Sequence, residues 1–275
     1  MSFKTLLVNM IVGHPNGAVL KVADELAQLL GAQTVGVTAC QPTTWLISGD
    51  GYSDGTVVKM LQDEFDKEIS AAEAEYRNAF SASKSMVEWR ASSVLLPLTD
   101  YIVREARCAD LIITSTVSAG SFDSMRHVNI GDLVMDAGRP VLVVPHAVAH
   151  TSLEQVMVAW KDTRESRRAV SDALPLLRAA KHVTVVEIAT TDDMSNAQTR
   201  VADVANWLER HGIKAYPVAS PAVGTDADCL DAILEKSNAD LVIAGAYGHS
   251  RLREWAFGGV TESLLRTGRC ALLSH

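Results

Sequence analysis

The order of hydrophobic and polar positions predicts alternating strands and helices. Continuous apolar runs are typical of strands buried on both faces, and apolar residues recurring every three or four positions are typical of helices. The first half has predicted strands at 4–12, 33–40, 86–91, 110–115 and 140–146. The second half has predicted strands at 155–160, 182–190, 213–218, 240–245 and 270–274. This alternation predicts parallel sheets with helices on both faces.

Each predicted helix carries one apolar stripe. The inward positions are expected to be Val22, Leu26 and Leu29; Phe65, Ile69, Ala72, Tyr76 and Phe80; Val170, Ala173, Leu174 and Leu177; Val201, Val204, Ala205 and Leu208; and Leu230, Ile233 and Leu234. Thr225 and Asp228 are spaced to cap the last of these helices. Residues 41–56 are rich in Pro, Thr, Ser and Gly, so they are expected to form a loop.

Two strands of the first half recur in the second at a constant offset. Residues 109–115 resemble 239–245, and 138–145 resemble 268–275, both 130 positions later. A constant offset favours an internal duplication over chance similarity of two buried strands. We therefore expect two similar domains, 1–147 and 152–275. Their last strands are apolar edges that could pair with each other, making an intrachain pseudo-dimer, and two chains could form a homodimer.

Composition excludes several classes of function. The formal net charge of -8 leaves no broad basic face for nucleic acid. No apolar run reaches the roughly 18 residues of a membrane span, and the apolar N-terminal run is too short for a signal peptide. The cysteines lack a C-x-x-C pair, which disfavours a metal site or redox pair and favours reduced core thiols in the cytoplasm. These cysteines are Cys40, Cys108, Cys229 and Cys270.

Glycines gather after the strand at 240–245. Gly245 and Gly248 follow that strand, and Gly258 and Gly259 precede a predicted short helix. Backbone N–H groups at a helix start favour an anion, and glycine lets a phosphate approach them closely. A tight turn is the alternative explanation. The sequence lacks the P-loop and G-x-G-x-x-G fingerprints and the G-x-S-x-G elbow, which disfavours those nucleotide sites and a serine hydrolase of that class.

The spacing of these glycines resembles the universal stress protein family. The family pattern is G-x2-G-x9-G followed by Ser or Thr, and Gly245, Gly248 and Gly258 match it, whereas Gly259 replaces the hydroxyl residue. The resemblance implies two tandem Rossmann-like α/β domains, similar to adenine nucleotide alpha hydrolases. Each would hold a five-stranded parallel sheet of order 3-2-1-4-5. It also implies binding of ATP, with ADP, AMP and an accompanying Mg²⁺ as variants.

Residues of the second half take their expected roles from this resemblance. Asp162 at the end of the first strand matches the family's acidic residue and would contact adenosine, or cap the helix with Glu165. The full expected site is Trp160, Asp162, Ile188, Ala244, Gly245, Gly248, His249, Arg251, Gly258, Gly259, Val260 and Thr261. His249 and Arg251 could neutralise phosphate charge or lie on a solvated loop. No metal-ligand set and no catalytic residue is expected.

The first half departs from this pattern. Ser115, Ser118, Val128 and Asn129 occupy the positions of the four glycines, and no Asp follows the first strand. A β-branched Val128 would crowd both the backbone and an approaching phosphate. We therefore predict no nucleotide site in residues 1–147. The histidines of this half, His14, His127 and His146, are expected to be structural or at the surface.

These observations favour a cytoplasmic stress-response protein that binds an adenine nucleotide in its second domain and has a regulatory role. Because no nucleophile, base and oxyanion donors stand out, fast catalysis is not expected. Two alternatives remain open: an interaction module that binds no nucleotide, and an enzyme that slowly hydrolyses nucleotide or an adenylated compound in the same site.

Overall fold

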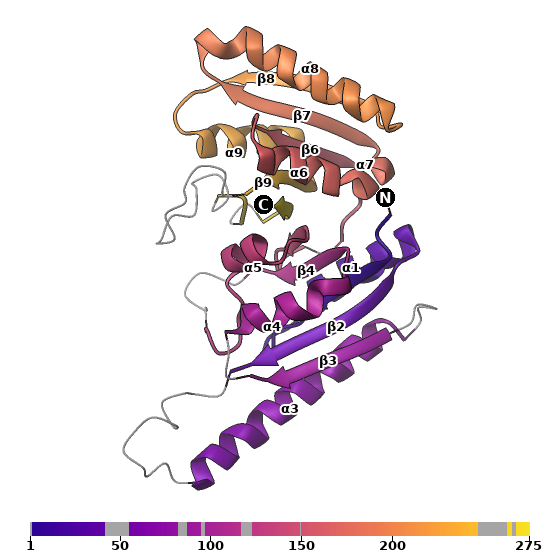
Figure 1. The fold of residues 1–275 in the computed structure, drawn as a ribbon, viewed down its shortest axis with the longest axis vertical. Coiled ribbons are helices and arrows are strands. Elements are labelled where there is room, and N and C mark those ends of the chain that lie inside the picture. Colours follow the sequence, from indigo (N-terminus) through magenta and orange to yellow (C-terminus); the bar gives the residue numbers. More distant parts are fainter. Residues whose placement is uncertain are drawn as a thin grey trace.

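The structure is a computed structural model that describes residues 2–41, 55–81, 87–94, 97–116, 123–148, 150–246, 263–265 and 268–275 (Figure 1). The strands are β1 (Thr5–Asn9), β2 (Gln33–Cys40), β3 (Val87–Ser93), β4 (Leu111–Ser115), β5 (Val141–Val144), β6 (Gln155–Trp160), β7 (His182–Ala189), β8 (Ala215–Pro221), β9 (Leu241–Gly245) and β10 (Cys270–Ser274). The α-helices are α1 (Gly17–Leu30), α3 (Gly55–Ala79), α4 (Leu98–Glu105), α5 (Ile130–Asp136), α6 (Arg164–Asp172), α7 (Leu174–Ala179), α8 (Met194–Arg210) and α9 (Asp226–Ser237).

All of these strands join one ten-stranded sheet. Its order is β3-β2-β1-β4-β5-β10-β9-β6-β7-β8. Strands β1 to β5 are parallel to one another, and so are β6 to β10. Counted within its own half, each set of five has the order 3-2-1-4-5. The predicted tandem fold is therefore confirmed.

The two halves meet where β5 pairs with β10 in antiparallel fashion. Val143 lies opposite Ala271, and Leu142 lies opposite Leu272. This confirms the expected pairing of the last strand of each half. The strands of the two halves consequently run in opposite directions, so the carboxyl ends of β1 to β5 lie on the side of the sheet where the amino ends of β6 to β10 lie. The predicted boundary at 147–152 falls in the connection between β5 and β6 and stays a prediction.

Helices cover both faces of the sheet, and each core layer runs across the junction. Buried residues of α1, α3, α6, α7 and α8 join one apolar cluster, which contains Leu142 and Leu272 of the paired strands. Residues of α4, α5 and α9 join a second cluster on the other face, which contains Val143 and Ala271. The halves therefore share a core on both faces.

Within the described residues, the predicted helices, strands and inward positions are confirmed with a few exceptions. Most of the loop predicted at 41–56 lies outside the described residues, at 42–54, and residues 55 and 56 belong to α3. Leu29 is 56% exposed, because α1 buries the stripe through Val19, Val22 and Leu26 instead. Cys108 is exposed, although it was expected in the core. The helix predicted near 170–177 is divided into α6 and α7, since Pro175 lacks the N–H that would continue the helix. None of the helices described combines the length and apolar character needed to cross a membrane.

Candidate functional site

The expected site is described only in part. Gly248, His249, Arg251, Gly258, Gly259, Val260 and Thr261 lie outside the residues that the structure describes. The described members are Trp160, Asp162, Ile188, Ala244 and Gly245. They lie at or near the carboxyl ends of β6, β7 and β9, which are neighbours in the sheet. The fold thus brings the backbone of these residues together at the carboxyl ends of three neighbouring strands.

Their side chains lie on different faces of the sheet. Trp160 packs against the cluster that contains α6 and α8. It pairs in register with Glu187, so the next residue, Ile188, points to the opposite face. Ile188 and Ala244 belong to the cluster that contains α9. The structure therefore does not bring the side chains of Trp160 and Ile188 together, and only groups beyond the strand ends can meet one ligand.

At Gly245 the backbone of β9 lies close to the backbone of α6. A Cβ atom at this position would lie 2.4 Å from the backbone nitrogen of Ser166 and 2.5 Å from the carbonyl carbon of Glu165. Real Cβ atoms do not approach backbone this closely, so the residue has to be glycine for α6 to pack here. The first glycine of the series accordingly serves a helix–strand contact.

Thr163, and not Asp162, caps α6. The Thr163 hydroxyl accepts a hydrogen bond from the backbone N–H of Ser166 at 3.3 Å. The side chain of Asp162 instead accepts from Arg167 at 2.6 Å and is half exposed. The capping role considered for Asp162 is therefore wrong, because the chain enters the helix one residue later. Its carboxylate stays accessible beyond the end of β6.

A chain of polar contacts connects the start of α6 to the end of β9. The Arg164 Nε donates to Glu165 at 2.5 Å, and its Nη2 lies 3.2 Å from His275 Nε2. The other ring nitrogen of His275 lies 3.0 Å from the carbonyl oxygen of Ala246. The tautomer with hydrogen on Nδ1 satisfies both contacts, since Nε2 then accepts from Arg164. Burial raises the pKa of the Glu165 carboxyl, but hydrogen bonds from Arg164, its own backbone and Thr163 hold it below its usual range.

Two further polar groups lie near this edge. The indole nitrogen of Trp160 is buried and has no hydrogen-bond partner among the described residues. Glu187 is 4% exposed and receives hydrogen bonds from Arg200 of α8, which also contacts Asp193. Sequence reasoning missed Glu187, Arg164 and His275. Glu187 could have been noticed as a charge inside an apolar strand. Arg164 and His275 carried no signal, because the two residues in contact are 111 positions apart.

The corresponding helix start in the first half is already capped. The Asn129 side chain accepts hydrogen bonds from the backbone N–H groups of Gly131 and Asp132, at 2.9 and 3.2 Å. Val128 before it is buried. Amides that would otherwise be open to an anion thus have a partner within the chain. The Ser115 hydroxyl at the end of β4 is buried and finds no hydrogen-bond partner in the part of the chain that the structure describes.

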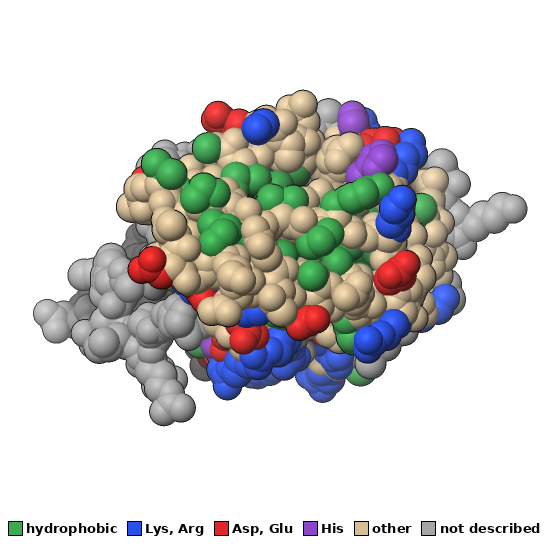
Figure 2. Space-filling model, turned by 90° about the horizontal axis from the view of Figure 1, so that it is seen from above, with side chains coloured by type: hydrophobic (Ala, Val, Ile, Leu, Met, Phe, Trp, Pro, Cys, Tyr) green, Lys and Arg blue, Asp and Glu red, His purple; other side chains and the backbone are tan. Residues whose placement is uncertain are grey.

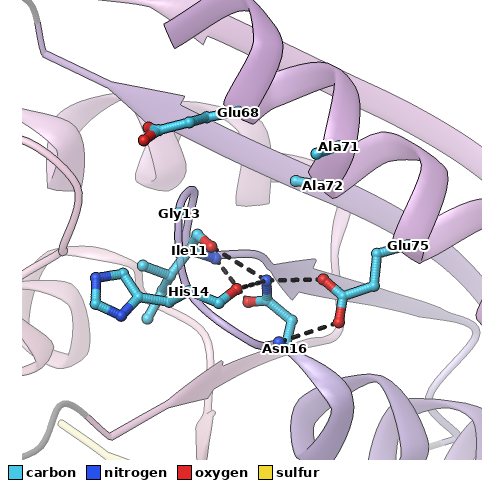
Figure 3. Close-up of a pocket in the computed structure, with 8 residues that line it drawn as sticks. All are labelled: Ile11, Gly13, His14, Asn16, Glu68, Ala71, Ala72 and Glu75. Atoms are coloured by element: carbon cyan, nitrogen blue, oxygen red, sulfur yellow. Dashed lines mark hydrogen bonds between the residues drawn. The ribbon is translucent and has the colours of Figure 1, made fainter. Parts of the chain in front are cut away.

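A pocket of about 220 Å³ lies beside the loop after β1 in the first half (Figure 3). Its lining residues are Ile11, Gly13, His14, Asn16, Glu68, Ala71, Ala72 and Glu75. Both Glu75 oxygens accept from Asn16, and both Glu68 oxygens accept from Arg126. Glu75 holds the loop after β1 against α3, Glu68 holds the segment of Arg126 against the same helix, and both carboxylates would repel a phosphate. In the described residues, no group of three His, Cys, Asp or Glu side chains could hold a metal ion.

The three histidines of the first half are structural or at the surface, as expected. His14 and His127 pack ring against ring, with centroids 4.7 Å apart. His127 is buried, and this burial lowers its pKa. His146 is exposed.

Comparison with solved structures identifies the fold. No model of a known protein family and no curated protein matches the sequence. A universal stress protein from Archaeoglobus fulgidus matches with a TM-score of 0.75 and 15% identity, over 98% of this chain and 97% of that one. A putative universal stress protein from Pseudomonas aeruginosa matches with a TM-score of 0.64 and 16% identity, over 99% and 93%. A functionally unknown protein from Pseudomonas aeruginosa matches with a TM-score of 0.61 and 14% identity, over 99% and 92%. The chain therefore has, over nearly its whole length, the fold of universal stress proteins.

Proposed function

We propose that the chain acts as a universal stress protein that binds ATP, or a related adenine nucleotide such as ADP or AMP, in its second half. The observation that carries this proposal is the G-x2-G-x9-G spacing, which begins where β9 ends beside β6. In open parallel sheets ligands bind beyond the carboxyl ends of the strands, where connections diverge to opposite faces. Here α6, which follows β6, lies on one face, and Leu264, in the helical residues 263–265 that follow β9, joins the core cluster on the other face.

The described part of the edge suits such a ligand. The half-exposed Asp162 carboxylate can accept a hydrogen bond from a ribose hydroxyl, and the exposed Arg164 guanidinium favours an anion. The backbone of Gly248 and of residues 258–261, with Thr261, would contact the phosphates and any accompanying Mg²⁺. The equivalent region of the first half offers capped amides and carboxylates, which supports a single site per chain.

The proposed role is regulatory and cytoplasmic. Nucleotide occupancy would favour one conformation or partner contact, which requires that the nucleotide bind one state better than the other. The expected site residues that the structure describes, Trp160, Asp162, Ile188, Ala244 and Gly245, include no serine, threonine or cysteine nucleophile, so slow hydrolysis is the second candidate and a nucleotide-free interaction module the third.

A pair of matched variants tests the proposal. Heat-denatured protein is analysed by mass spectrometry for released nucleotide, and calorimetry then measures ATP binding to the nucleotide-free chain. Gly248→Val is expected to abolish binding because the added branched side chain blocks the backbone. Ser118→Val places the same residue at the equivalent position of the first half and is expected to leave binding unchanged.

The other outcomes separate the alternatives. Loss of binding only in Ser118→Val would move the site to the first half. An unaltered chain that releases no nucleotide and shows no heat with ATP, ADP or AMP would reject nucleotide binding and favour the interaction module. Release of ADP and phosphate from added ATP would favour the slow hydrolase.

A further inference from the structure

We propose that Arg164 contacts the phosphate groups of the ligand and makes the site prefer nucleotides over adenosine. This inference rests on the proposed function and adds a residue that the glycine pattern does not contain. Arg164 is the first residue of α6. The next two residues, Glu165 and Ser166, pack against Gly245 at the end of β9. The guanidinium is therefore anchored beside the strand from which the glycine segment continues.

The Arg164 side chain is held in place and still exposed. Its Nε donates to Glu165 and its Nη2 to His275, while the side chain as a whole is 76% exposed. Arginine carries five N–H donors, so these two contacts leave the others open to solvent. A guanidinium fixed on one side can bind a phosphate with its other side without losing further side-chain freedom.

The charges around Arg164 favour an anion on its outer side. The Glu165 side chain is only 6% exposed, so its carboxylate lies beneath the guanidinium and away from solvent. Neighbouring cations have carboxylate partners that are less buried than Glu165: Lys161 pairs with Asp226, Arg167 with Asp162, and Arg168 with Asp172, whose side chains are 49%, 52% and 25% exposed. Among these basic residues, Arg164 alone combines a buried carboxylate partner with an exposed, oriented guanidinium.

His275 is a positioning residue in this arrangement. Its imidazole bridges Arg164 and the carbonyl of Ala246, the residue directly after β9. The bridge sets the direction of the guanidinium relative to the start of the glycine segment. Removing the imidazole would free the guanidinium on one side, so it would weaken phosphate binding less than removing the guanidinium itself.

Calorimetry of variants with ATP and adenosine tests this inference. Arg164→Gln is expected to weaken ATP binding about ten-fold or more, the usual size of a lost hydrogen bond between charged groups, and to leave adenosine binding unchanged. His275→Ala is expected to weaken ATP binding by a smaller factor. Arg168→Gln is the control, because it removes the same charge from the same helix. Arg168 donates a hydrogen bond to the carbonyl oxygen of Gly138 in the first half, so this variant is expected to bind ATP normally.

Three results would overturn the inference, in distinguishable ways. Unchanged ATP affinity in Arg164→Gln shows that the guanidinium does not meet the phosphates. Equal losses for ATP and adenosine, with unchanged thermal stability, show an effect on the whole site and not on phosphate recognition. An unaltered chain that binds no adenine nucleotide removes the proposed function as well, whereas the first two results leave that function standing.

Discussion

Gly245 and Ser115 occupy equivalent strand ends but have different surroundings. Gly245 is in contact with the backbone of α6, where a Cβ would lie 2.4 Å from the Ser166 nitrogen. Ser115 has room for a side chain, but its hydroxyl is buried and has no hydrogen-bond partner within the described ranges. One position of the repeat therefore tolerates no side chain, and the other holds a polar group at a cost in stability.

Alanine at each position should change stability in opposite directions. Gly245→Ala forces α6 away from β9 and is expected to lower the free energy of unfolding by about 1–3 kcal/mol, as overpacking does. Ser115→Ala removes an unpartnered hydroxyl and is expected to be neutral or to raise that free energy by about 1 kcal/mol. Urea unfolding monitored by circular dichroism measures both. An unchanged midpoint for Gly245→Ala would show that the contact relaxes freely.

The sequence was most informative where a pattern is local. Continuous apolar runs predicted β2, β6 and β10 to the residue, and the Thr225–Asp228 spacing predicted the capping box of α9. The contact of Gly245 with α6 could not be predicted, because glycine after a strand equally suits a turn or a ligand. The contact between Arg164 and His275 spans 111 positions, and no periodicity connects them.

At the scale of elements, an ion pair connects β7 to α8. Arg200 donates to both Glu187 oxygens, at 2.6 to 3.1 Å, and to Asp193 at 2.6 Å. These hydrogen bonds raise the pKa of the Arg200 guanidinium. Glu187 is the buried member, while Asp193 is exposed. A buried carboxylate without its partner is costly, so Arg200 holds the end of β7 against the helix that covers it.

Removing only Arg200 should lower the free energy of unfolding more than replacing both Arg200 and Glu187 with apolar residues. Arg200→Met leaves Glu187 buried and unpaired, and is expected to lower the free energy of unfolding by roughly 1–3 kcal/mol. The double variant Glu187→Leu with Arg200→Met leaves no buried charge, so part of that loss should be recovered. Asp193→Ala is the control and should change stability little. Thermal unfolding that ranks the double variant below Arg200→Met would contradict this account.

At the scale of the whole molecule, the sheet ends at two edge strands, β3 and β8. In β8, Tyr216 and Val218 are 47% and 41% exposed, and Val223, just after the strand, is 75% exposed. Seen from the end that carries α8 and β8, apolar side chains spread over this part of the surface, with charged side chains around its margin (Figure 2). An apolar edge of this kind invites pairing with another chain unless the backbone prevents it.

Two prolines prevent that pairing along β8. The N–H of Ala222 donates to Ala189 of β7 at 2.9 Å, so the alternate residues Pro217, Ala219 and Pro221 direct their backbone outward. Proline has no N–H to offer, and edge strands are where it is tolerated. A homodimer of two chains, which the sequence leaves open, would therefore need a surface other than the β8 backbone.

Restoring the missing donors should cause association. The double variant Pro217→Val with Pro221→Val presents an unbroken outward row of N–H groups beside exposed apolar side chains, and is expected to form larger species than the unaltered chain as concentration rises. Ser220→Val adds apolar surface at the same edge while its N–H points inward to β7, so its mass should not change. Light scattering coupled to size-exclusion chromatography measures the masses. Equal masses for the double variant and the unaltered chain would show that something other than the prolines keeps this edge unpaired.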